Sequence, residues 1–141
     1  MNVLIHAHRK GVPQHRDALG WLKHLAEGNR PWAIPVFCLG EFVRVATHPR
    51  VLNPPSTIEQ ALTAIDNLLE SPSVRVLSPG ARYPSLFAEA VLLGDARGNL
   101  AFDAQIAALC REQGVARLLT QDRDFTRFSH IEVVTVDRPP G

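Results

Sequence analysis

Four acidic residues occupy positions where a carboxylate needs an explanation. Glu41 and Asp103 interrupt apolar segments of helical character, where a charge is costly unless something neutralises it. Asp122 and Asp124 directly follow a strand-like run. Carboxylates that converge from separate elements make a site for a hard divalent cation such as Mg²⁺ or Mn²⁺. Such a site can activate water and stabilise a phosphodiester transition state.

Each of these positions also has a purely structural interpretation. Asp103 would be favourable near the positive end of a helix dipole, and Glu41 could pair with Arg44 at i+3. Asp122 and Asp124 could cap a turn. The residues alone leave both interpretations open, and convergence of the carboxylates in space would favour the metal site.

Histidine and cysteine offer weaker candidates. His6 and His8 have strand spacing and would point the same way, which suggests zinc. The other histidines are scattered and no cysteine joins them, so we expect surface or loop-packing histidines rather than a zinc site. Cys38 and Cys110 lie in apolar helical stretches and are predicted to be buried free thiols.

Length and composition indicate a soluble globular protein. A chain of 141 residues with 45% apolar and 21% charged residues fits one domain. A net charge of +1 argues against strong general affinity for polyanions, so any nucleic-acid binding needs local basic patches. No apolar run approaches the roughly 20 residues of a membrane span, and no signal layout opens the chain. We therefore expect a cytoplasmic protein without membrane contact.

The elements that must position the acids alternate between strand and helix. Helices are expected at 15–28, 35–47, 57–70, 83–93 and 99–113, and strands at 3–5, 32–34, 74–77, 116–120 and 131–136. This order predicts an α/β fold with a central parallel sheet of four to five strands covered on both faces. Sites in such folds form beyond the carboxyl ends of strands, where Asp122 and Asp124 fall.

Local signals define several helix ends. The spacing in Ser56-Thr57-Ile58-Glu59 is that of a capping box, Asn99 is expected to cap the next acid-bearing helix, and Gly114 to end it. The apolar run 35–46, with Trp32, is compatible both with a partner-binding surface and with burial in the monomer core.

Taken in order, the motifs resemble a PIN domain, specifically the toxin of a VapBC toxin–antitoxin pair. The resemblance covers nearly the whole chain and rests on the segments Asn2-Val3-Leu4-Ile5-His6-Ala7-His8-Arg9, Gly40-Glu41-Phe42, Thr47-His48-Pro49-Arg50-Val51, Gly98-Asn99-Leu100-Ala101-Phe102-Asp103-Ala104, and Thr120-Gln121-Asp122-Arg123-Asp124-Phe125 with Arg127-Phe128.

The resemblance implies a PIN-like three-layer α/β/α domain spanning 1–141 and an endoribonuclease dependent on Mg²⁺ or Mn²⁺ that cleaves tRNA or ribosomal RNA. It implies metal binding by Glu41, Asp103 and Asp122, assisted by Asp124, with Thr120 orienting the carboxylates or a water. A VapB-like antitoxin and a homodimer are the implied partners. The candidates for holding RNA phosphates are Arg9, Arg50, Arg97 and Arg123.

The chain departs from the family pattern at its start. The family opens with Asp-x-Asn, and Asn2 aligns with that Asn, so the first metal-binding Asp would precede Met1. We expect a first strand truncated at its N-terminus through a misassigned start. The alternative is a catalytically silent module that binds its antitoxin or RNA without cutting. A response-regulator receiver is disfavoured, because Lys10 and Lys23 lie too early for the lysine that it needs.

Overall fold

The computed structural model describes residues 1–140, which divide into two compact units. The first unit comprises Met1–Val76 together with the segment from Val136 onward, and the second comprises Leu77–Thr135. Within the described residues no helix is both long enough and apolar enough to cross a membrane.

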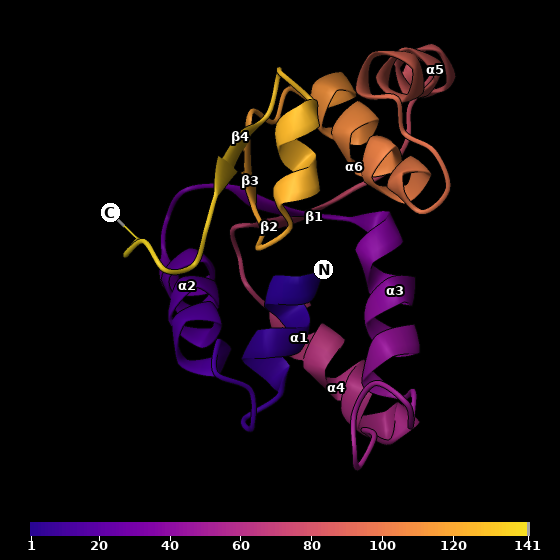
Figure 1. The fold of residues 1–141 in the computed structure, drawn as a ribbon. Coiled ribbons are helices and arrows are strands. Elements are labelled where there is room, and N and C mark those ends of the chain that lie inside the picture. Colours follow the sequence, from indigo (N-terminus) through magenta and orange to yellow (C-terminus); the bar gives the residue numbers. More distant parts are fainter. Residues whose placement is uncertain (141) are drawn as a thin grey trace. The chain divides into compact units, whose positions relative to one another are not determined.

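The first unit is mainly helical (Figure 1). Helix α1 packs against α2 and α3, and α3 packs against α4. Trp21 on α2 fastens the C-terminal segment, because its indole N–H donates to the Arg138 carbonyl at 2.8 Å. The elements are α1 (Asn2–His8), α2 (His15–Glu27), β1 (Trp32–Pro35), α3 (Val36–Ala46), α4 (Ile58–Leu69) and β2 (Val74–Leu77), with β1 paired to β2.

The second unit places two helices beside a short parallel strand pair. Strands β3 and β4 align Leu118 with Val133, and α5 packs along α6 (Figure 1). Ala104, Ala107 and Ala108 of α6 are fully buried, and their small side chains allow neighbouring elements to approach closely. The elements are α5 (Tyr83–Gly94), α6 (Leu100–Glu112), β3 (Arg117–Leu119), the 3₁₀ helix η1 (Arg123–Arg127) and β4 (Glu132–Val134).

Most predicted elements are confirmed, but the N-terminal strand is wrong. Residues 3–5 lie within α1, where the Leu4 and Ile5 amides donate to the Met1 carbonyl at 3.0 and 3.2 Å. A short apolar run has no periodicity that separates a strand from a buried helix, so the residues 3–5 alone fit either element. The prediction that the side chains of His6 and His8 point the same way is therefore also wrong, because side chains two residues apart on a helix point in different directions.

His8 instead joins α1 to its neighbours. Its Nε2 lies 2.9 Å from the Ser56 hydroxyl, and its ring meets the ring of Phe42 edge-on at 5.3 Å. Burial, with a smaller contribution from the Arg9 charge, lowers the pKa of His8. The environment of His8 is therefore that of a packing histidine.

The central sheet is also smaller than predicted. The described residues form two separate two-stranded sheets, β1–β2 and β3–β4, rather than one sheet of four to five strands. The residues expected to form the first strand are helical, which leaves four short strands, and these pair two by two. The α/β class is confirmed, and the continuous sheet is not.

The capping box of α4 lies one residue later than predicted. The Thr57 hydroxyl accepts from the Gln60 amide at 3.1 Å, and the Gln60 side chain accepts from the Thr57 amide at 2.9 Å. Ser56-x-x-Glu59 and Thr57-x-x-Gln60 both satisfy the pattern, and Ser56 is engaged with His8 instead. Asn99 is the N-cap residue of α6 as predicted, although its side chain makes no capping hydrogen bond.

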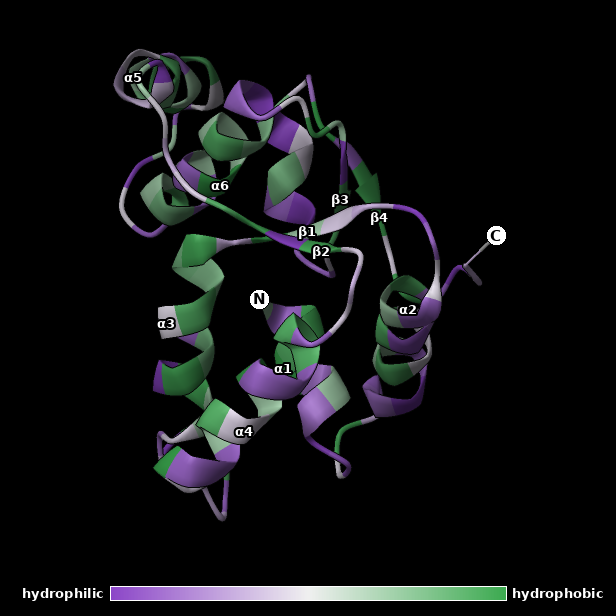
Figure 2. Ribbon diagram, turned by 180° about the vertical axis from the view of Figure 1, so that it is seen from behind, coloured by the Kyte–Doolittle hydropathy of each residue, from purple (hydrophilic) through white to green (hydrophobic). Residues whose placement is uncertain are grey.

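Helix α3 is mostly apolar along its length (Figure 2), and much of it is core. Cys38, Phe42, Val45 and Ala46 are buried, and the Trp32 indole N–H donates to the Ser71 hydroxyl at 3.2 Å. The core interpretation of this run is therefore confirmed for these residues. Cys38 and Cys110 are buried free thiols, as predicted, and burial raises the pKa of Cys38.

Two glycines, one in open space and one against the Phe128 ring, give a matched test of how side-chain packing affects stability. A Cβ at Gly20, inside α2, would meet no atom within 4 Å, whereas a Cβ at Gly94 would lie 2.7 Å from Cε1 of the buried Phe128 ring. Gly20→Ala should raise the free energy of unfolding by about 0.5–1 kcal/mol. Gly94→Ala should lower it by about 1–2 kcal/mol through overpacking. Urea denaturation measures both, and shifts of the same sign would contradict the packing around Phe128.

Candidate metal centre

Three of the four predicted carboxylates converge in the second unit. Each of Asp103, Asp122 and Asp124 offers an oxygen that lies within 4.8 Å of the others. Asp103 comes from the first turn of α6, whereas Asp122 and Asp124 come from the segment that joins β3 to η1. The convergence expected of a metal site is therefore present for these three residues, and Asp122 also caps η1, as its structural interpretation predicted.

The segment that carries Asp122 and Asp124 is held by successive hydrogen bonds. Thr120, only 4% exposed, donates its amide to the Val134 carbonyl at 2.9 Å. Its hydroxyl oxygen accepts from the Asp122 amide at 3.0 Å, and Oδ1 of Asp122 accepts from the Asp124 amide at 2.9 Å. The Asp122 carboxylate and the backbone of both aspartates are thereby held at the end of the β3–β4 pair.

The electrostatics of this cluster suit a cation. Carboxylates a few ångströms apart repel one another, and a divalent cation that binds to all three relieves that repulsion. Hard oxygen ligands are the donors that Mg²⁺ and Mn²⁺ prefer. Asp103 and Asp122 are half-buried and Asp124 is exposed, so the cluster can be reached from solvent. The donor set fits the predicted ion.

Glu41 belongs to the first unit, on α3. Its side chain is 44% exposed, and its Oε1 lies 3.9 Å from a guanidinium nitrogen of Arg44, the i+3 partner foreseen from the sequence. The apolar surroundings expected of Glu41 are wrong, because the exposed side of α3 carries it. Its role as a metal ligand stays a prediction.

The four arginines proposed for RNA lie on different segments, two in each unit. Arg123 lies within η1, between the two clustered aspartates in sequence, and is exposed. Arg97 pairs with Asp95 at 2.9 Å on the surface. Arg9 ends α1, and Arg50 lies in the loop after α3, where its amide donates to Nδ1 of His48 at 3.1 Å. Arg123 is the member of this set that sits in the acidic segment itself.

The cap predicted for the acidic segment is confirmed at Asp122, whereas the sequence did not identify the amides that Thr120 and Asp122 bind. The spacing Thr-x-Asp-x-Asp carries the signal, because Ser, Thr and Asp side chains commonly accept from the amide two residues ahead. Both bonds found here have that i to i+2 form.

Comparison with known proteins places the chain in a family. It matches the PIN domain family over residues 1–131. It is 37% identical over 131 residues to ribonuclease VapC43 of Mycobacterium tuberculosis, covering 93% of this chain and 88% of that protein. It is 32% identical over 139 residues to ribonuclease VapC31 of the same species, covering 99% and 95%.

A solved structure shares the fold at low identity. The crystal structure of VapBC2 from Rickettsia felis, bound to a DNA fragment from their promoter, matches with a TM-score of 0.68 and 20% identity, covering 95% of this chain and 93% of that chain. With the family match and the relatives above, these findings show that the chain belongs to the PIN domain family and, within it, to the VapC ribonucleases.

Proposed function

We propose that this chain is the toxin of a VapBC-type pair and cleaves cytoplasmic RNA, tRNA or ribosomal RNA, as a divalent-metal-dependent endoribonuclease. The observation that carries the proposal is the convergence of Asp103, Asp122 and Asp124 within 4.8 Å in a chain of this family. The relatives named as ribonucleases support the reaction class.

In this proposal the three aspartates hold Mg²⁺ or Mn²⁺ through their carboxylate oxygens. The bound ion would supply Lewis acidity toward the phosphodiester and activation of the attacking water. Asp124 is the exposed member, so it faces the side from which RNA can approach. Thr120 acts through Asp122, because its hydroxyl oxygen fixes the amide of that residue.

Glu41 stays a proposed further metal ligand on the ground of the family resemblance, and the proposed phosphate contacts are Arg9, Arg50, Arg97 and Arg123. Arg123 is the strongest of these, because it is exposed beside the acidic residues in η1. Guanidinium groups bind phosphate oxygens bidentately, which suits this role.

The direct test is cleavage of a labelled pool of total tRNA and ribosomal RNA. The proposal expects cutting with Mn²⁺ or Mg²⁺ and none with EDTA. Cutting that persists unchanged in EDTA would overturn the metal-dependent mechanism. The absence of cutting with every divalent ion, in protein that still binds RNA or antitoxin, would support the silent-module alternative instead.

Thr120 offers a test of positioning. Thr120→Val keeps the approximate volume of the side chain but removes the acceptor for the Asp122 amide, so the backbone that positions the Asp122 carboxylate loses a hydrogen bond. Groups that orient metal ligands typically contribute about 10–100-fold to metal affinity or activity. We expect a loss of that order in Mn²⁺ affinity, measured by titration, and recovery in Thr120→Ser. A Ser variant as weak as the Val variant would point to packing rather than positioning.

Two partners are also proposed, a VapB-like antitoxin and a second copy of the chain. Exposed apolar side chains support protein contacts, since they lose unfavourable contact with water when covered. In the first unit three of them follow one face of α4, and in the second they lie at the end of α5 and the start of α6. The residues are Ile58, Leu62 and Leu69, and Leu92, Leu93 and Phe102.

A further inference from the structure

Charge is unevenly distributed along the chain, although its net charge is only +1. Residues 1–50 contain seven lysines and arginines against three aspartates and glutamates, whereas residues 51–141 contain eight against eleven. Such asymmetry between two parts of a chain is typical of proteins that bind a polyanion through a local basic surface. The basic excess belongs to the first unit, whereas the acidic cluster belongs to the second.

Helix α2 exposes a basic face in the first unit. Arg16, Gly20 and Lys23 are exposed and lie at i, i+4 and i+7, which places them along one side of the helix. Ala18 and Leu22 are buried on the opposite side. The two cationic residues are about 10.5 Å apart along the axis at 1.5 Å per residue. These three exposed residues are called the α2 basic face below.

The space between the two cations is open. A Cβ at Gly20 would meet no atom within 4 Å, so no other described element covers the helix at this point. Lys10, in the segment before α2, and Arg30, in the segment after it, are also exposed. Cations therefore occur before, along and after the exposed side of this helix.

These cations are not neutralised by neighbouring carboxylates. In the part of the chain that the structure describes, no ion pair involves Lys10, Arg16, Lys23 or Arg30. By contrast, a carboxylate lies within ion-pair distance of each of Arg44, Arg97, Arg111 and Arg117. The positive potential of the α2 basic face is therefore available to an external anion.

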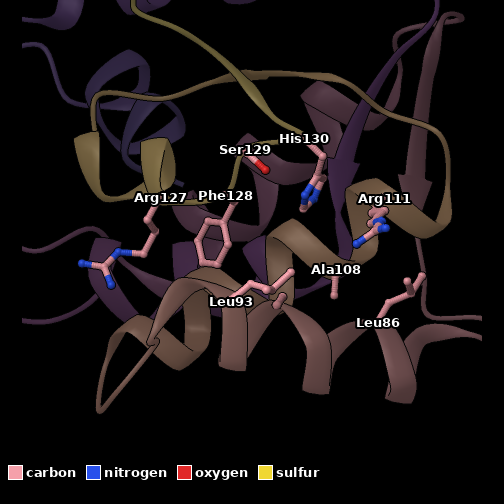
Figure 3. A pocket seen from close by; sticks show the side chains of 9 residues that line it. Leu86, Leu93, Ala108, Arg111, Arg127, Phe128, Ser129 and His130 are labelled. Atoms are coloured by element: carbon pink, nitrogen blue, oxygen red, sulfur yellow. The ribbon is translucent and has the colours of Figure 1, made fainter.

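Two arginines of the second unit show the contrast. Arg111 pairs with Glu89 at 2.8 Å, and the Arg127 guanidinium donates to the Gly94 carbonyl. Figure 3 shows Arg111 and Arg127 among the side chains that line a pocket of that unit. Both guanidinium groups already have partners within the protein, whereas the cations of the α2 basic face have none.

The α2 basic face also lacks the apolar side chains that a protein partner would cover. The large exposed apolar side chains of the described residues begin at Val51, and none lies within residues 1–50. The core of a protein–protein interface is apolar and poor in charge, whereas nucleic-acid interfaces are more polar and more positively charged. The surface therefore fits a polyphosphate better than an acidic protein.

We propose that the α2 basic face binds the phosphate backbone of RNA, as a docking surface in a different unit from the acidic cluster. The inference rests on the proposed ribonuclease function. A separation of about 10.5 Å spans about three nucleotides of one strand at roughly 3.4 Å each, so Arg16 and Lys23 can bind the same strand. Lys10 and Arg30 extend the contact beyond the ends of the helix. Phosphate contacts carry no sequence information, so this surface would hold RNA of any sequence.

The test is binding of labelled oligouridine and oligoadenosine, measured by fluorescence anisotropy in EDTA so that neither is cut. Each phosphate contact on a single strand contributes about 0.7 to the slope of log affinity against log salt concentration. Arg16→Gln combined with Lys23→Gln should lower the magnitude of that slope by about 1.4 between about 50 and 200 mM KCl. Affinity at the lower salt concentration should fall by about 10-fold, equally for both RNAs.

Arg111→Gln combined with Arg117→Gln is the matched control. It removes the same net charge, but from cations that already pair with Glu89 and Glu132. Its affinity and salt slope should be those of the unaltered chain. Equal losses in the two double variants would overturn the inference and assign the effect to net charge alone.

Glu27→Gln tests the same side of α2 with the opposite sign. Glu27 is exposed at i+4 from Lys23, so its carboxylate lies on the same side of the helix and repels phosphate. The variant should bind both RNAs more tightly, a change that damage to the fold would not produce. Unchanged or weaker binding in Glu27→Gln would contradict the assignment of this side of α2 to RNA.

Three further results would also overturn the inference. The first is a salt slope that stays the same in the variant of Arg16 and Lys23. The second is a loss of affinity confined to one of the two RNAs, which would indicate base contacts instead of phosphate contacts. The third is lost binding of poly-glutamate with unchanged RNA binding, which would assign the face to an acidic protein.

The binding assay keeps this inference apart from the proposed function. If no RNA is cut with Mn²⁺ but the salt slope falls in the variant of Arg16 and Lys23, the docking surface stands and the nuclease proposal fails. If RNA is cut but the slope is unchanged, the nuclease stands and the docking surface fails. Mn²⁺ affinity, measured by titration, should be the same in all these variants.

Discussion

Asp103→Asn should reduce metal-dependent RNA cleavage by more than about 100-fold. The amide keeps the size of the side chain but removes the charge from one of three carboxylates that lie within 4.8 Å of each other. Groups that only orient metal ligands contribute about 10–100-fold, so a direct ligand should contribute more. The measurement is the initial rate of cleavage of labelled RNA over a range of Mn²⁺ concentrations, together with Mn²⁺ affinity by titration.

Asp95→Asn is the control for this variant. Asp95 is an exposed acid of the same unit, outside the cluster, and it pairs with Arg97. Its φ of 45° is left-handed, a conformation that asparagine adopts readily, so the substitution should leave the backbone unchanged. Mn²⁺ affinity should match that of the unaltered chain, whereas a change in cleavage alone would report the release of Arg97, one of the proposed phosphate contacts, from its ion pair. A full rate in Asp103→Asn would remove Asp103 from the proposed ligand set.

Glu112→Ala should lower the free energy of unfolding by about 2–3 kcal/mol. The Glu112 carboxylate accepts from the Gly80 amide at 2.6 Å and from the Arg82 amide at 2.9 Å, and Nη2 of Arg82 donates to the Glu112 carbonyl at 3.0 Å. These hydrogen bonds hold the loop before α5 against the end of α6. Hydrogen bonds to charged groups contribute about 1.5–3 kcal/mol each, less where water competes. Urea denaturation gives the value directly.

Glu89→Ala separates this effect from the loss of any surface charge. Glu89 also lies in the second unit, but it makes an exposed ion pair with Arg111 at 2.8 Å. Exposed ion pairs contribute about 0–1 kcal/mol, so the loss should be small. Glu112→Gln keeps one carbonyl acceptor, so its loss in free energy of unfolding should lie between the losses of Glu112→Ala and Glu89→Ala. Equal losses in the two alanine variants would show that the backbone contacts of Glu112 contribute no more than an ordinary surface pair.

Strong periodicity and clear end signals made much of the fold predictable. Helix α2 begins at His15 and is followed by Gly28 as expected, and α6 is followed by Gln113 and then Gly114, whose φ is 73°. The strands β1 and β2 were also found where short apolar runs lie between turn residues. Local backbone preference and amphipathic spacing act within a few residues, so the sequence carries these features directly.

The errors occur where local signals are ambiguous. Residues 3–5 are apolar without a period, so the same letters suit a strand and a buried helix turn. Ser56 and Thr57 each precede a Glu or Gln by three residues, and the contact of Ser56 with His8, far away in the sequence, occupies the alternative cap. Strand pairing likewise depends on segments distant in the chain, so the division into two small sheets could not be anticipated.

By itself the sequence determined the order of the elements and the placement of Asp103 near a helix start and of Asp122 and Asp124 after a strand. Only the tertiary structure decided that their oxygens lie within 4.8 Å of one another. The physical reason is that α6 and the β3–η1 segment are joined by packing between residues far apart in sequence. Residue spacing predicts which side chains of one helix or strand point the same way, whereas the distance between two elements is set by which side chains pack together.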